Sequence, residues 1–131
     1  MNIALIEIKG SDECVSRFLS SINLKITSQW KKGDPFGKSH IHQQAGLKAE
    51  ICDVDSPQEM IGCIRDYFAE CENRNICFTD TEIDAVLDIG VGVGDGEQFI
   101  VFVEFTNRDL SLMSKLGLGL SITAYPVEDD S

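Results

Sequence analysis

Apolar side chains recur along this chain with two different spacings, and the changes between them outline a protein of strands and helices. Residues 3–8 are apolar except for Glu7 and contain three β-branched isoleucines, which is typical of a strand. A short helix follows, because apolar residues recur at helical spacing as far as Ile22 and either Ser11 or Asp12 can cap it. Residues 24–30 then alternate as a second strand.

The middle of the chain contains the strongest helix signal. Glycine and proline interrupt the stretch between Trp30 and Gly46, which predicts a loop, and residues 47–52 predict a third strand. Residues 56–59, Ser-Pro-Gln-Glu, combine an N-cap serine, a proline at the first helical position and a glutamate three residues after the cap. The helix that follows has one apolar stripe, made by Met60, Ile61, Ile64, Tyr67, Phe68 and Cys71.

The second half of the chain predicts a hairpin. Residues 73–84 are a polar, acidic connection, and residues 85–93 and 99–105 then alternate with period two around a Gly-Asp-Gly-Glu turn at 94–97. The alternating glycines at 90–96 lack the spacing of a phosphate-binding loop. They indicate a sheet face that stays bare so that a helix or an aromatic ring can lie close to it.

A third helix and a last strand complete the pattern. Asn107 is expected to cap the helix and Gly117 to end it, and residues 118–124 predict the strand. The sequence therefore predicts a single α+β domain over residues 1–126, with six strands in a mixed or antiparallel sheet and about three helices mainly on one face. The acidic tail, 127–131, is expected to be disordered.

Charge is divided unevenly between the two parts of the chain. Residues 1–48 hold seven basic and four acidic residues, a net charge of +3, whereas residues 49–131 hold four basic and eighteen acidic residues, a net of −14. The total of −11 opposes binding to nucleic acid or to an anionic membrane and favours a basic protein partner, although acidity can also serve solubility alone. The acids expected at the partner surface are Asp66, Glu70, Asp80, Glu82, Asp84, Asp95 and Glu97.

Signals for catalysis and for cofactors are weak. The five cysteines form no CxxC pair, so we expect free thiols that pack as small apolar side chains in a cytoplasmic protein. No apolar run is long enough to span a bilayer. The acids at 80, 82 and 84 alternate as calcium ligands could, but the EF-hand pattern is missing. We therefore expect no catalytic residues, no resident metal and no cofactor, and a binding protein rather than an enzyme.

The basic loop after Trp30 is the alternative place for a ligand. Trp30 is the only tryptophan, and we expect it to pack in the core at the end of the sheet, with stacking on a base or sugar as the alternative. His40 and His42 are two residues apart, so they would project to one side of a strand and could share a metal ion. Two histidines do not make a metal site, and solvated loop histidines are the simpler interpretation.

The arrangement resembles a bacterial family known as domain of unknown function 4279. The resemblance rests on the early strand–helix–strand unit that ends in the sequence ITSQWKKGD at 26–34, on the amphipathic middle helix, and on the strand at 99–105 with the helix and strand after it. It implies the same α+β fold, and the family has no established catalytic residues to carry over to this sequence. In kind, a small acidic α+β protein without catalytic motifs is also similar to the immunity proteins of bacterial polymorphic toxin and contact-dependent growth inhibition systems.

These observations predict a non-enzymatic binding protein. The leading hypothesis is an immunity protein that neutralises a basic, nuclease-type toxin domain through the acidic residues named above. The alternative is a domain that binds a small ligand or a metal through the loop from Trp30 to His42.

Overall fold

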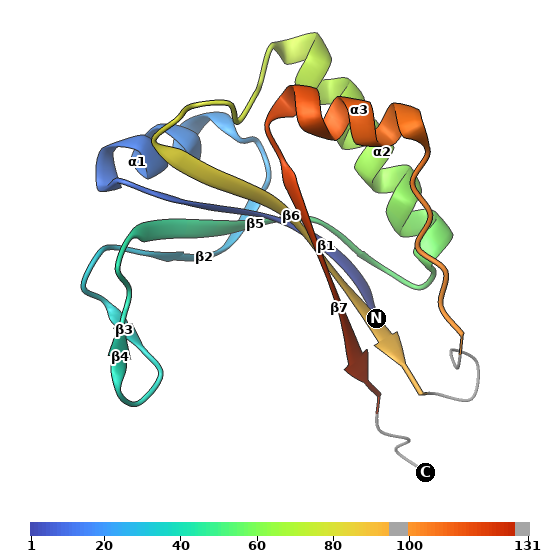
Figure 1. The fold of residues 1–131 in the computed structure, drawn as a ribbon, viewed down its shortest axis with the longest axis horizontal. Helices are drawn as coiled ribbons and strands as arrows, with labels where there is room; N and C mark the ends of the chain where they lie inside the picture. Colours follow the sequence, from blue (N-terminus) through green and yellow to red (C-terminus); the bar gives the residue numbers. More distant parts are fainter. Residues whose placement is uncertain (95–99, 128–131) are drawn as a thin grey trace.

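A computed structural model describes residues 1–94 and 100–127 as a twisted sheet with three helices packed on one of its faces (Figure 1). The elements in chain order are β1 (Asn2–Gly10), α1 (Asp12–Ser21), β2 (Lys25–Trp30), β3 (Pro35–Phe36), β4 (His40–Ile41), β5 (Ala45–Val54), α2 (Pro57–Arg74), β6 (Ile83–Val93), α3 (Asn107–Leu116) and β7 (Gly119–Pro126). The prediction of an α+β fold with three helices is confirmed.

The main sheet has five strands in the order β2-β5-β1-β6-β7. The first strand of the chain, β1, lies at the centre and pairs antiparallel with β5 on one side and with β6 on the other. Strand β7 pairs parallel with β6, so the sheet is mixed. Ile6 marks the middle of the sheet, where it lies opposite Ala49 of β5 and Leu87 of β6.

The hydrophobic core lies between the sheet and the helices. Ala4, Ile6 and Ile8 alternate along β1 on the face that the helices cover, and all three are fully buried. The stripe predicted on α2 is buried as expected, and it packs against this face with α1 and α3. We call the opposite side, which carries Glu7, Lys9 and Lys48, the open face of the sheet.

Local capping groups fix the ends of the helices. Ser56 caps α2 as predicted, because its hydroxyl accepts a hydrogen bond from the backbone N–H of Glu59 at 3.1 Å. The cap of α3 is Thr106 and not Asn107, since the Thr106 hydroxyl accepts from the Asp109 backbone while the Asp109 carboxylate accepts from the Thr106 backbone. No helix in the described ranges is long and apolar enough to cross a bilayer.

The segment between β2 and β5 is more ordered than the predicted loop. Residues 31–44, which we call the arm, contain the short strands β3 and β4, paired antiparallel as a sheet of their own. The base of the arm is closed by backbone hydrogen bonds from Gly33 to His42 (2.8 Å) and from His42 to Asp34 (2.9 Å). The arm projects from the β2–β5 end of the main sheet, on the side away from the helices (Figure 1).

The predicted strand at 99–105 is wrong for the part that the structure describes. Residues 101–106 pair with no described strand, although Val101, Val103 and Phe105 pack against the core. The predicted hairpin does not form because β1 and β7 already pair with the two edges of β6. No backbone hydrogen-bonding groups of β6 are left for residues 101–105. Residues 95–97 of the predicted turn lie outside the described residues.

The end of the sheet confirms the interpretation of the glycines. A Cβ atom on Gly90 would lie 3.0 Å from the ring of Tyr125, so the missing side chain lets an aromatic ring lie close to β6. The ladder continues for one residue past β7, where the Val127 N–H donates to the carbonyl of Val93 at 2.8 Å. The rest of the predicted tail, 128–131, lies outside the described residues.

Candidate functional site

A cavity of about 530 Å³ lies between the arm and the open face of the sheet. Its floor comes from β1, β2 and β5, and its wall comes from the arm and from the tryptophan at the end of β2. The residues that line it are Glu7, Lys9, Ser28, Trp30, Phe36, Ile41, His42, Gln43, Gln44 and Lys48. A second cavity of about 500 Å³ shares Glu7 and Lys9 but has no aromatic lining.

Trp30 forms the base of the aromatic wall. Its ring lies directly over Gly46 on the neighbouring strand β5, where any Cβ atom would overlap the indole. The indole N–H donates a hydrogen bond to the carbonyl of Gln44 at 3.1 Å. Trp30 is therefore half-buried on the open face, which corrects the expectation that it packs in the core.

Two rings of the arm continue this wall. The imidazole of His42 stacks on Trp30, with ring centres 4.6 Å apart and planes 19° apart, and Phe36 tilts against His42 at 4.8 Å. Phe36 and Ile41 are 59% and 57% exposed, although both are large and apolar. An arm that presents such side chains toward a cavity offers apolar contact area to a ligand.

The floor of the cavity carries charge of both signs. The ammonium groups of Lys9 and Lys48 lie 3.2 Å and 3.7 Å from the carboxylate of Glu7, which neutralises only one of them. The three side chains together hold a net charge of +1. Because β1, β2, the arm and the start of β5 all come from the basic part of the sequence, the cavity lies in the basic region of an acidic protein.

The sequence indicated the wall of this site but not its floor. Trp30 is the single tryptophan and His42 is one of two histidines, so both are conspicuous in the sequence. Glu7, Lys9 and Lys48 lie on β1 and β5, and the sequence alone does not show that these two strands pair. The alternation of apolar and charged residues on these strands did indicate that the three charged side chains share the face opposite the core, since each lies between buried residues. His40 and His42 join no group of three possible metal ligands in the described part of the chain.

The structure does not gather the predicted acidic residues on one surface. Several of them already contact groups of this chain: Glu70 accepts from Arg74 and Asn23 at 3.2 Å each, Asp80 lies 3.3 Å from Arg17, and Glu82 accepts from the Cys14 thiol at 3.0 Å.

The predicted acids that the structure describes also lie on different sides of the sheet. Asp66 and Glu70 belong to α2, on the helix side. Asp84 pairs in register with Lys9 between the buried Ile83 and Ala85, so it belongs to the open face. Asp95 and Glu97 lie outside the described residues. The predicted partner surface is therefore divided between two faces in the part that the structure describes.

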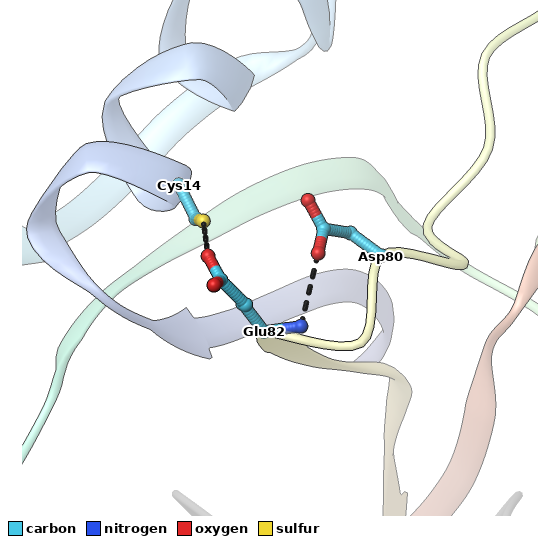
Figure 2. A group of neighbouring side chains, drawn as sticks. All are labelled: Cys14, Asp80 and Glu82. Carbon is cyan, nitrogen blue, oxygen red and sulfur yellow. Dashed lines mark hydrogen bonds between the residues drawn. The ribbon is translucent and has the colours of Figure 1, made fainter.

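A second cluster of ionisable groups lies where α1 meets the start of β6. Figure 2 shows Cys14, Asp80 and Glu82 turned toward one another, with ligand atoms within 4.8 Å. The guanidinium of Arg17 donates to the Cys14 sulfur at 2.9 Å and lies 3.3 Å from the Asp80 carboxylate. The guanidinium of Arg17 therefore already supplies a cation beside the Cys14 thiol and the Asp80 carboxylate. Asp80 also accepts a hydrogen bond from the backbone N–H of Glu82 at 2.9 Å. This cluster is a structural ion pair with a thiol.

The other cysteines differ in their burial. Cys71 is buried, and Cys52 and Cys63 are half-buried, which agrees with the expected packing role, whereas Cys77 is exposed. Burial raises the pKa of the Cys52 thiol to about 12 and also raises the pKa of Cys71. Such thiols stay protonated at neutral pH and are weak nucleophiles.

Comparison of the chain with protein-family models, with curated proteins and with solved structures gives no match. The resemblance to domain of unknown function 4279 and to immunity proteins stays a prediction.

Proposed function

We propose that this chain is a non-enzymatic binding domain that holds a small, flat, anionic ligand in the cavity beneath the arm. The single observation that carries the proposal is the combination of an aromatic wall with two lysines on the floor of a cavity of about 530 Å³. Cavities of this size, largely apolar and with a few convergent polar groups, are typical of small-molecule sites.

The wall favours a ligand with an apolar or aromatic part. Phe36 and Ile41 are exposed on the arm, and their burial by a ligand would remove apolar surface from water. The indole of Trp30 is covered by Gly46 on one face and by His42 on the other, so its role is to hold the imidazole of His42 in place. A ligand ring would therefore meet the arm side chains first.

The floor favours a negative charge on the ligand. Glu7 balances one of the two lysines, so a carboxylate or phosphate on the ligand can pair with the second ammonium group. Ser28 and the amides of Gln43 and Gln44 add hydrogen-bonding groups around the same cavity. A cationic ligand would meet two ammonium groups and is disfavoured.

Fluorescence of the single tryptophan tests the proposal directly, because Trp30 lines the cavity. We expect naphthalene-2-carboxylate to change this fluorescence saturably, and (2-naphthylmethyl)ammonium, the cation of similar shape, to bind more weakly. Lys48→Gln should weaken binding of the carboxylate about fivefold, since one charged contact is worth about 1 kcal/mol. The matched control is Lys115→Gln, on α3 and away from the cavity. Equal binding of both probes, or no saturable change with either, would overturn the proposal.

A second candidate function is inhibition of a basic toxin domain, as in immunity proteins. The observation that favours it is the net charge of −14 on residues 49–131. We expect the tagged chain to retain one stoichiometric basic protein from a lysate of its native host at low salt and to release it at high salt. Asp66→Lys and Asp84→Lys, on opposite sides of the sheet, would show which face is used. Retention that neither salt nor either variant changes would argue against this function.

A further inference from the structure

Among residues 1–94 and 100–127, strand β7 forms an edge of the main sheet without the protection that edge strands usually have. It is eight residues long, pairs regularly with β6 along its length, and all of its residues are exposed. Its sequence, GLSITAYP, contains no charged residue. Leu120 and Ile122 lie in register with the buried Leu87 and Ile89, yet they are 41% and 49% exposed. The apolar face of the sheet therefore extends to β7, where the helices no longer cover it.

The other edge of the same sheet shows the contrast. Strand β2 is shorter, begins with Lys25, and is irregular between Ile26 and Ser28 where it pairs with β5. Short length, lysine and bulges are the means by which proteins prevent edge strands from pairing with other chains. The β2 edge uses all three, whereas β7 has only Pro126 at its end. Of the two edges, β7 is the one open to pairing.

We propose that β7 pairs antiparallel with β7 of a second copy of this chain. A two-fold axis through the middle of the strand would place Ile122 against Ile122 and Leu120 against Ala124. The axis must stand perpendicular to the sheet, so the two sheets join into one with both open faces on the same side. The apolar side chains that now lie beyond the helices would then pack against each other.

The distribution of charge selects a second copy over a basic strand. A cationic segment would find no acidic side chain on β7 itself, so it would form no ion pair with the strand along the seam. Two copies with a net charge of −11 each repel one another. An uncharged edge strand is where they can approach with the least repulsion, because no carboxylate of β7 would face its equivalent. A seam of one strand is small, and interfaces below about 1,200 Å² are usually weak.

Sedimentation velocity of the full chain between about 1 and 200 µM tests this proposal. We expect a species of twice the 14.5 kDa chain mass to grow with concentration, and to grow further at 0.5 M NaCl because salt screens the repulsion between copies. Ile122→Lys should raise the dissociation constant at least tenfold, because half of this side chain is already exposed in one copy and would meet its equivalent in the dimer.

The control is Ala69→Lys, which changes the net charge equally at an exposed position of α2, away from β7 and from the ligand cavity. It should leave the dimer unchanged, and circular dichroism should show that both variants are folded. A wild-type chain that stays monomeric at 200 µM, or two variants that weaken association equally, would overturn the proposal. None of these results depends on the ligand cavity, so the two proposals fail separately.

Discussion

Asp109 links two helices through a carboxylate that is almost fully buried. It accepts hydrogen bonds from the guanidinium of Arg65 on α2 at 2.9, 3.0 and 3.3 Å, and another from the backbone N–H of Thr106 at 2.9 Å. The hydrogen bonds from Arg65, and then those from Thr106, lower the pKa of Asp109 to about 2. One side chain thus caps α3 and holds it against α2.

This pair predicts a specific dependence of stability on pH. Because the pKa of Asp109 is lower in the folded chain than in the unfolded one, its contribution is fully present above about pH 4 and is lost as the pH falls toward 2. Asp109→Asn should lower the free energy of unfolding by about 2 kcal/mol at pH 7. In urea titrations the difference from wild type should shrink between pH 4 and pH 2.

Asp66→Asn is the control, since it changes a carboxylate that projects from α2 in an exposed position. It should have little effect at either pH. A constant difference between wild type and Asp109→Asn from pH 7 to pH 2 would show that the carboxylate contributes by shape rather than by charge.

The position of the arm depends on one glycine in β5. The ring of Trp30 lies on Gly46, His42 stacks on Trp30, and Phe36 contacts His42, so the arm is held against the sheet through a chain of contacts that begins at the glycine. A side chain at position 46 would displace the first ring and with it the wall of the cavity.

Gly46→Ala should therefore lower the free energy of unfolding by about 1–3 kcal/mol through overpacking and shift the Trp30 emission to longer wavelength as the ring meets water. Gly62→Ala is the matched control, because a Cβ atom at this position of α2 has no neighbour within 4 Å. It should be neutral or raise stability by up to about 1 kcal/mol. Unchanged Trp30 emission in Gly46→Ala would contradict the supporting role of the glycine.

Local and non-local elements differ in how well the sequence predicts them. The start of α2 was predicted correctly because its signal lies within four residues, and α3 was displaced by one residue because Thr106 and Asn107 are both good caps. The segment at 99–105 has the alternation of a strand, but alternation shows only that a segment could pair. Whether it forms a hairpin depends on whether β6 has a free edge, and both edges of β6 are taken by β1 and β7, which are distant from this segment or follow it in the chain.

Across the whole molecule, the uneven charge of the sequence becomes a difference between regions. The basic part of the chain builds the arm and the floor of the cavity, which the sequence could only suggest. The acidic part builds α2, β6, α3 and β7, and its carboxylates are divided between two faces or joined to groups of the same chain. Net charge is readable from composition, whereas its position depends on the fold.

The central place of β1 sets the order in which the chain can fold. The strand is synthesised before both of its partners, and Ile6 can pair only after Ala49 on one side and Leu87 on the other have been made. A growing chain on the ribosome therefore exposes the apolar side chains of β1 until β6 has been made. Because so many contacts join distant residues, folding should be slow for a chain of this size, and the nascent chain should depend on chaperones until β6 emerges.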